Sequence, residues 1–126
     1  MRGFACAALL ALTACGVSAG DVPMIAGDYE LIEVEGKEIF GKPTARIAPD
    51  GAISGQGPCN VYRSENSAEL PALDYKTMVT TRRACIREGG ETDFLAALGA
   101  VRQAERRGGE LVMTGPGVTI RWYPLP

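Results

Sequence analysis

The chain has 126 residues, of which 46% are hydrophobic and 22% are charged, so wholesale disorder and a fibrous repeat are excluded and one folded domain is expected. Lys and Arg number 13 against 15 Asp and Glu, and this slightly acidic balance argues against a general nucleic-acid binder. The absence of histidine excludes Ser-His-Asp and Cys-His triads and His-ligated zinc.

Residues 1–14 have the order of a secretory signal, namely a basic residue, an apolar run and then small residues. The run is too short to cross a bilayer as a stable helix. It ends at Leu12-Thr13-Ala14-Cys15, which resembles the lipobox of bacterial lipoproteins, where the cysteine is lipidated and becomes the mature N-terminus. We therefore expect a cleaved signal peptide over 1–14, a lipid on Cys15 and a tether over 15–26.

An ordinary secretory cut after Ala19 is the alternative, because Val17-Ser18-Ala19 also has small residues where that cleavage needs them. Both hypotheses place the domain outside the cytoplasm. Several acyl chains on Cys15 would hold it durably to a membrane, since a single chain binds only marginally. In lipoproteins of this kind a small residue after the cysteine goes with outer-membrane sorting, so Gly16 favours that membrane over a soluble periplasmic location.

Two cysteines remain for the folded part, Cys59 and Cys85, once Cys6 leaves with the signal and Cys15 takes the lipid. In an oxidising compartment we expect them to pair. Closing a loop of about 26 residues would stabilise the fold by roughly 3.5 kcal/mol. A redox-active pair and two free thiols are the alternatives, but a redox pair usually appears as C-x-x-C, far from this spacing.

The first half of the chain predicts a succession of short strands. Residues 27–34 are rich in β-formers and lead into a turn at 35–37. Pro49-Asp50-Gly51 is a strong turn signal and predicts a hairpin. The strands expected here are 27–34, 44–48, 52–54, 60–64 and 70–75, with irregular backbone over 55–58.

The second half predicts one helix and three strands. Phe94, Leu98 and Val101 recur at helical spacing, which indicates an amphipathic helix over 88–100. Glycine-containing turns then separate strands expected at 101–107, 110–114 and 118–123. Regular short strands with one late helix predict a mostly β, α+β domain over 27–124, in which an antiparallel sheet curls or closes into a barrel-like form around a core.

Arginines are the main candidates for a binding surface. They form two groups: Arg82, Arg83 and Arg87 flank Cys85, and Arg102, Arg106 and Arg107 follow the predicted helix. Together they could receive an anionic partner such as lipid headgroups or envelope polysaccharide. Ordinary surface charge is the alternative, because Asp and Glu are interspersed among them.

Three other motifs have simpler explanations than a ligand site. The stretch from Gly55 to Asn60 lacks the remaining residues of a phosphate loop, so we expect a tight bend that places Cys59. Trp122-Tyr123 is interpreted as a core or rim contact rather than a ligand platform. A carboxylate pair or cation site is possible at the four glutamates of the first strand and turn, but a solvated face explains them better. These are Glu30, Glu33, Glu35 and Glu38. We expect no metal and no cofactor.

The order and spacing of the segments between Gly27 and Tyr123 resemble the META domain, the small domain of the HslJ heat-shock-associated proteins. The stretch 27–31 is similar to the opening strand, with Tyr29 where Trp is usual. The stretch 50–62 resembles a glycine-bounded turn leading into Gly-Cys-Asn, with Pro58 in place of the glycine. The stretch 80–85 resembles a segment ending in Met-Ala-Cys, with arginine in place of the methionine.

This resemblance implies a mostly antiparallel β domain with one helix and supports pairing of Cys59 with Cys85. It carries over no catalytic residue, because the family has none established and is linked only loosely to heat shock, antibiotic tolerance and motility.

We therefore expect a non-enzymatic, monomeric envelope lipoprotein domain that supports stress tolerance through a protein or cell-wall contact, without nucleic acid. A periplasmic inhibitor or binding module, such as a lysozyme inhibitor, is the alternative, since such inhibitors are also compact disulfide-bearing β domains on lipid tethers. A third hypothesis is an enzyme using Tyr75, Lys76 or the glutamates, but these residues lack a visible activating partner.

Overall fold

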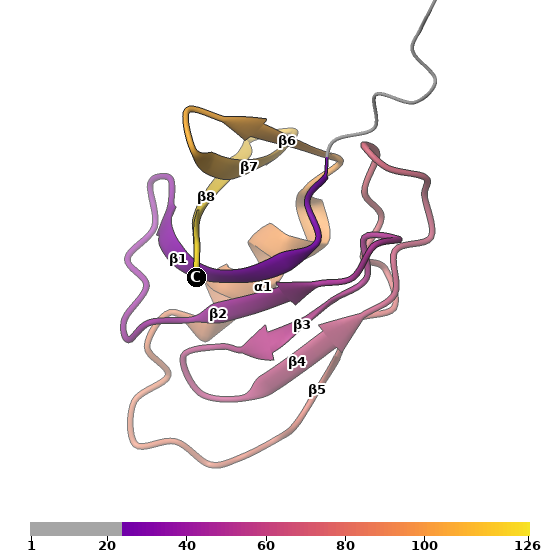
Figure 1. Cartoon of the computed structure of the whole chain (residues 1–126). Helices are drawn as coiled ribbons and strands as arrows, with labels where there is room; N and C mark the ends of the chain where they lie inside the picture. Colours follow the sequence, from indigo (N-terminus) through magenta and orange to yellow (C-terminus); the bar gives the residue numbers. More distant parts are fainter. Residues whose placement is uncertain (1–23) are drawn as a thin grey trace, which may run out of the picture.

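Eight short strands form one antiparallel sheet in the computed structural model, which describes residues 24–126 (Figure 1). The predicted signal peptide, Cys15 and most of the predicted tether lie outside the described residues. The elements are β1 (Gly27–Val34), β2 (Thr44–Ile47), β3 (Ile53–Gln56), β4 (Val61–Ser64), β5 (Val79–Thr80), α1 (Glu91–Ala100), β6 (Gln103–Arg107), β7 (Glu110–Gly115) and β8 (Val118–Pro124). The described strands, α1 and the buried core lie between Met24 and Pro126.

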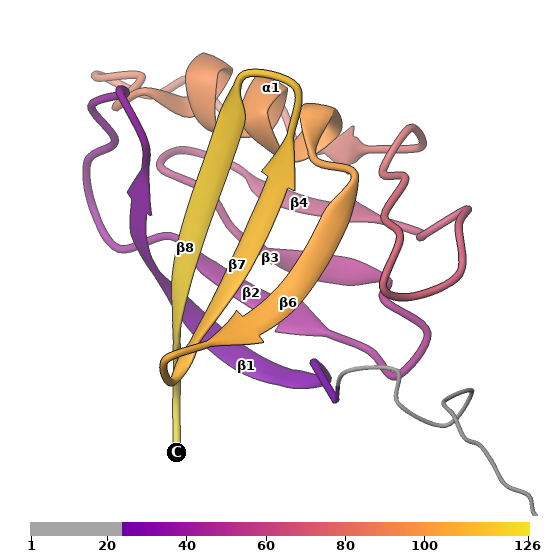
Figure 2. The same cartoon turned by 90° about the horizontal axis from the view of Figure 1, so that it is seen from above.

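The order of strands across the sheet is β5-β4-β3-β2-β1-β8-β7-β6, which places β1 near its centre. The register between β1 and β8 shifts between Leu31 and Glu33, and such a bulge bends a strand and increases its twist. The sheet curls around the core, and α1 packs within the curl (Figures 1 and 2). The prediction of a mostly antiparallel β fold with one helix is confirmed.

Aromatic side chains connect α1 to both halves of the sheet. The Phe94 ring lies 5.4 Å from the Tyr62 ring of β4 and 6.2 Å from the Trp122 ring of β8, centroid to centroid, in edge-to-face arrangements. Leu98 and Val101 are also fully buried, as the helical spacing predicts. The apolar face of one short helix therefore fills the space that the sheet encloses.

The sheet is open, because its outer strands β5 and β6 do not pair with each other. An irregular segment covers part of β6 instead: Ala104 N–H donates to the Pro71 carbonyl at 2.9 Å, and Leu73 N–H donates to the Arg102 carbonyl at 2.8 Å. The structure therefore gives no support to a closed, barrel-like sheet.

The strand predicted over 70–75 is wrong, since this segment contributes only an isolated bridge between Ala72 and Gln103. Pro71 has no N–H to give to a ladder. The Asn66 side chain satisfies other backbone groups of the segment: its Oδ1 accepts from Asp74 N–H at 2.8 Å, and its Nδ2 donates to the Ala72 carbonyl at 3.3 Å. A side chain thus replaces the neighbouring strand as hydrogen-bond partner.

The irregular backbone predicted over 55–58 is wrong in its first half, because Gly55 and Gln56 continue β3 opposite Tyr62 and Val61. Gly55 lies beside a hydrogen bond between β4 and β2, in which the Tyr62 hydroxyl donates to the Thr44 carbonyl at 2.6 Å. A Cβ at this position would collide with that carbonyl. Glycine here serves close packing inside a strand rather than a turn.

The helix begins at Glu91 rather than at residue 88. Glu88 lies just outside it, and its carboxylate accepts the N–H groups of Gly90 and Thr92. These bonds satisfy donors that the first turn leaves free. At the other end, Arg102 Nη1 donates to the Gly99 and Val101 carbonyls at 3.1 and 2.9 Å. In the part of the chain that the structure describes, no helix has the length and apolar character needed to cross a membrane.

Candidate functional site

A disulfide between Cys59 and Cys85 joins the β3–β4 loop to the segment that precedes α1, with the two Cα atoms 6.1 Å apart. The predicted pairing is confirmed. Cys59 is buried, whereas Cys85 lies in the exposed stretch 81–88. The bridge therefore ties an exposed segment without regular structure to the edge of the core.

Glu91 is a second, buried anchor of the same loop, with only 7% of the residue exposed. Its Oε1 accepts the backbone N–H groups of Cys59 and Asn60 at 2.8 and 2.7 Å, and its Oε2 accepts Asn60 Nδ2 at 2.6 Å. Three donors compensate the loss of water around a buried carboxylate. The acidic residue near the helix start was noticeable in the sequence, but nothing there indicated a partner 31 residues away.

Asn60 extends this network toward the arginines. Its Oδ1 accepts the Thr81 hydroxyl at 2.9 Å and the Arg83 backbone N–H at 2.7 Å. Arg83 Nη2 in turn donates to the Cys59 carbonyl at 2.8 Å. The predicted arginine group is thus divided: all three arginines are exposed, but Arg83 holds the loop, whereas the side chains of Arg82 and Arg87 make no hydrogen bond or ion pair within residues 24–126.

The arginines of the second group bind other residues of the domain. Besides Arg102, which binds carbonyls at the end of α1, Arg106 Nη1 donates to the Tyr29 hydroxyl at 3.2 Å, and Arg107 Nε pairs with Glu105 at 2.7 Å. Figures 1 and 2 show β6 and the 81–90 segment on different sides of the molecule. The two groups therefore do not form one basic patch.

Two loops beside the disulfide form an exposed surface, which we call the tip surface. Phe40 N–H donates to the Gly89 carbonyl at 2.9 Å, so the 35–43 loop lies against the 81–90 segment. Phe40 is 51% exposed and Ile86 fully exposed. The name covers the exposed residues Lys37, Phe40, Lys42, Arg82, Ile86 and Arg87, and in the sequence of each loop the apolar residue lies between two cationic ones. Three glutamates, Glu35, Glu38 and Glu88, lie in the same loops, and Glu88 is occupied with the helix start.

The tip surface lies on the side of the molecule away from the point where the described chain begins. In Figures 1 and 2 the two loops are side by side, whereas the N-terminal end of β1 is at the other side of the sheet. Strand β1 runs from one side to the other over Gly27–Val34.

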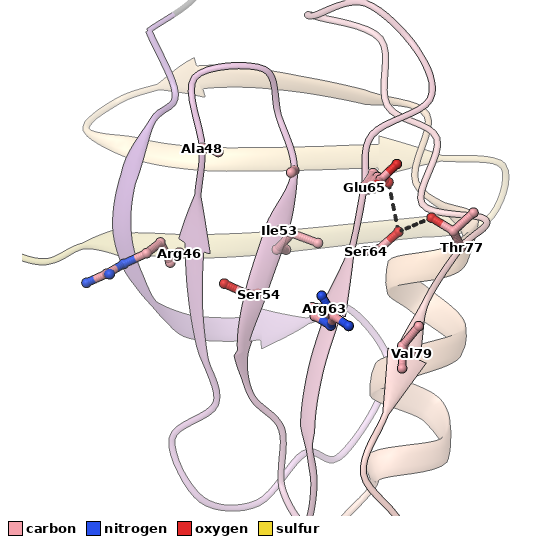
Figure 3. Close-up of a pocket in the computed structure, with 10 residues that line it drawn as sticks. Arg46, Ala48, Ile53, Ser54, Arg63, Ser64, Glu65, Thr77 and Val79 are labelled. Carbon is pink, nitrogen blue, oxygen red and sulfur yellow. Dashed lines mark hydrogen bonds between the residues drawn. The ribbon is translucent and has the colours of Figure 1, made fainter.

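A separate groove of about 510 Å³ lies on the outer face of β2, β3 and β4 (Figure 3). Arg46, Ser54 and Arg63 form a row across these strands, because Ser54 is the register partner of both arginines. Arg46 Nε pairs with Asp28 at 2.8 Å, whereas Arg63 makes no ion pair among residues 24–126. The residues that line the groove are Arg46, Ala48, Ala52, Ile53, Ser54, Arg63, Ser64, Glu65, Thr77 and Val79.

The other candidate residues have structural partners. Arg121 joins two glutamates on the outer face, Glu33 at 2.8 Å and Glu110 at 2.8 Å. The buried Tyr75 hydroxyl donates to the Gly51 carbonyl at 2.8 Å, and burial raises the pKa of Tyr75. Between Met24 and Pro126 no three His, Cys, Asp or Glu side chains come together as a metal site would require.

The two aromatic residues at the end of the chain differ in environment. Trp122 is fully buried in the core, as predicted, and Tyr123 is exposed on the opposite face of β8. Alternation along a strand accounts for the difference. Trp122 therefore cannot serve as a ligand platform.

Comparison with known proteins shows the family of this chain and two structures with a similar fold. The family model of the META domain matches residues 22–123. One NMR structure is similar with a TM-score of 0.60 at 21% identity, covering 86% of this chain and 96% of its own. A second NMR structure, of a protein from Burkholderia xenovorans, has a TM-score of 0.63 at 17% identity, covering 89% of this chain and 94% of its own. These identities show a common fold alone. No curated protein matches the sequence.

Proposed function

Because this chain belongs to the META domain family, we propose that it acts as a non-enzymatic binding domain of the bacterial cell envelope, held to the outer membrane by a lipid on Cys15. Its contact is the tip surface, and its partner is an anionic polymer of the cell wall. The observation that carries this proposal is the exposure of two apolar side chains, Phe40 and Ile86, in adjacent loops that also carry four exposed cationic residues.

The tip surface is held in place before any partner arrives. The Cys59–Cys85 bridge and the Glu91 carboxylate fix the β3–β4 loop to the 81–90 segment, and Phe40 N–H ties the neighbouring loop to Gly89. A partner that binds ordered loops pays little of the entropic cost of ordering them. This supports recognition by a preformed surface.

The chemistry of the tip surface suits an anionic partner with apolar portions. Lys37 and Lys42 flank Phe40, and Arg82 and Arg87 flank Ile86. Exposed cations attract an anionic surface over about one Debye length, roughly 8 Å at physiological ionic strength. The apolar side chains add area to bury at the contact. Binding of this kind weakens as salt is added.

The location of the tip surface favours the cell wall over the membrane that would hold the tether. The described chain enters at the side away from the 35–43 and 81–90 loops (Figures 1 and 2). This placement supports a contact of Phe40 and Ile86 with the cell wall rather than with the anchoring bilayer.

A non-catalytic role is supported by the hydrogen bonds and the ion pair that the reactive side chains already make within the domain. The Tyr75 hydroxyl donates to a backbone carbonyl and its pKa is raised by burial, so it stays protonated. Lys76 lies 3.5 Å from Asp74, and Glu91 accepts three hydrogen bonds. None of these groups has the paired acid and base that proton-transfer catalysis uses.

Cosedimentation with purified cell-wall sacculi tests the contact directly. We expect the soluble chain that starts at Asp21 to bind at low salt and to be released at high salt. The double variant Arg82→Glu/Arg87→Glu should not bind the sacculi. The matched control Arg107→Glu, on β6, should bind as the wild type does. Equal binding by all three chains would contradict the proposal.

The stress role is tested in cells. A deletion strain should lose tolerance to heat and to envelope-directed antibiotics, and the wild-type chain should restore it where Ile86→Asp does not. A deletion strain as tolerant as wild type would contradict a role in stress. If the soluble chain inhibits lysozyme at micromolar excess, the inhibitor hypothesis replaces the cell-wall contact.

A further inference from the structure

We infer that the groove over β2, β3 and β4 is a binding site for a small amphiphile with one anionic group and an apolar body. This site is separate from the tip surface, and it does not depend on the function proposed above. The groove holds about 510 Å³, within the range of roughly 300 to 1,000 Å³ that small-molecule sites occupy. Figure 3 shows the side chains that surround it.

The anionic group is accommodated at the row Arg46–Ser54–Arg63. Ser54 is the register partner of Arg46 and Arg63, but the Arg46 side chain points toward β1 (Figure 3), so Arg63 is the cation left beside the Ser54 hydroxyl. Asp28 engages Arg46 through its Nε and Nη2 at 2.8 and 3.4 Å, which holds this arginine on the β1 side of the groove. Arg63 makes no ion pair within the described part of the chain. Charge complementarity therefore indicates an anion above Ser54.

The apolar body is accommodated by the remaining wall and floor of the groove. Val79 is the register partner of Arg63, lines the groove and is 54% exposed, so it offers an apolar side chain to a ligand. Ala48 and Ala52, at the two ends of the β2–β3 turn, are small and leave room beside it. A ligand that covered Val79 would remove this apolar area from water.

Hydrogen bonds hold the wall of the groove in place. The Ser64 hydroxyl donates to the Glu65 carbonyl at 2.8 Å and is hydrogen-bonded to the Thr77 hydroxyl at 3.4 Å (Figure 3). These bonds fasten the segment leading to β5 beside β4, so the groove exists without a ligand. The Glu65 carboxylate at its rim disfavours a second negative charge, which selects monoanions.

Titration with the fluorescent probe anilinonaphthalene sulfonate, which carries one sulfonate on apolar rings, tests the site. We expect the soluble chain that starts at Asp21 to bind one probe saturably. Arg63→Gln should weaken binding about tenfold, as loss of a charge-assisted hydrogen bond does. Arg107→Gln, an arginine paired with Glu105 on β6, is the matched control and should bind as wild type does. Thermal unfolding of each variant checks that it is folded.

Three further measurements make the inference falsifiable. The neutral analogue phenylnaphthylamine should bind more weakly than the sulfonate, and Glu65→Gln should bind the sulfonate at least as tightly as wild type. Octanoate and octyl phosphate, compared as competitors, distinguish a carboxylate ligand from a phosphate ligand. Equal binding by wild type and Arg63→Gln, equal binding of the neutral analogue, or displacement by neither competitor would overturn the inference.

Discussion

Glu91 and Asn60 are separated by 31 residues, yet the carboxylate of Glu91 accepts both the backbone N–H of Asn60 at 2.7 Å and its side-chain Nδ2 at 2.6 Å. The contact joins the first turn of α1 to the loop between β3 and β4. The same Asn60 binds Thr81 and the Arg83 backbone through its Oδ1. One buried carboxylate and one amide therefore position the exposed segment that carries Arg82, Ile86 and Arg87.

Loss of the Glu91 carboxylate should destabilise the fold strongly. Glu91→Ala leaves three buried N–H donors without their acceptor, and we expect the free energy of unfolding to fall by about 3 kcal/mol. Glu91→Gln keeps one oxygen for the two backbone donors and should lose less. Urea denaturation measures both, with the exposed Asp93→Ala on the same turn as control. An Asp93→Ala loss as large as that of Glu91→Ala would contradict the anchoring role.

Removal of the disulfide should cost about 3.5 kcal/mol, because the 26-residue separation of Cys59 and Cys85 sets the entropy that closing the loop removes from the unfolded chain. The measurement is urea denaturation of the Cys59→Ser/Cys85→Ser chain beside the wild type with and without dithiothreitol. Reduced wild type should match the double variant. An unchanged midpoint after reduction would show that Glu91 alone holds the loop.

Two glycine-to-alanine changes should have opposite effects. Gly55→Ala places a methyl group against the Thr44 carbonyl and 2.9 Å from the Tyr62 hydroxyl, so we expect a loss of about 1 to 3 kcal/mol. Gly99→Ala meets nothing within 4 Å inside α1 and should gain about 0.5 to 1 kcal/mol. Thermal unfolding of both variants is the check, and a tolerated Gly55→Ala would mean that β2 and β3 can separate there.

Acid should destabilise the domain through three carboxyl groups. A hydrogen bond from Arg46 lowers the pKa of Asp28, bonds from Thr92 lower that of Glu88, and a bond from Arg121 lowers that of Glu110. Since each pKa is lower in the folded state, the stability they contribute is complete above pH about 4, their ordinary range. It is lost as pH falls through the lowered values.

We therefore expect the Tm to be level from pH 7 to about 5 and to drop below pH 4. The drop should be smaller when the three carboxyls are replaced in the Asp28→Asn/Glu88→Gln/Glu110→Gln chain. Glu35→Gln, at an exposed position, is the control. A triple variant with the full acid sensitivity of wild type would assign the effect to other groups.

The membrane anchor is tested by the intact mass of the protein recovered from bacterial membranes. We expect a chain that starts at Cys15 and carries a diacylglyceryl-scale addition, with two thiols appearing only after reduction. The Cys15→Ala variant should be soluble. A wild-type chain that is soluble and starts near Gly20 would establish ordinary secretion and remove the tether from the proposed function.

Local patterns were sufficient for most elements. Alternating β-formers predicted β1, glycine and proline turns predicted the β2–β3 and β6–β7 hairpins, and the spacing of Phe94 and Leu98 predicted α1. These signals depend only on neighbours in the chain. The predictions failed where tertiary contacts override them: the Asn66 side chain takes the hydrogen bonds of a predicted strand, and Gly55 is needed for close packing within β3.

Composition, residue order and the count of cysteines are enough to predict the class of fold, the family resemblance and the two cysteines that pair. Three relationships depend on the folded arrangement: Glu91 anchors the disulfide loop, Arg83 binds the Cys59 carbonyl, and Arg46 and Arg63 line one groove. These relationships join residues far apart in sequence. They are set by strand register and by the burial of a charged group against distant donors, and neither is visible in a local pattern.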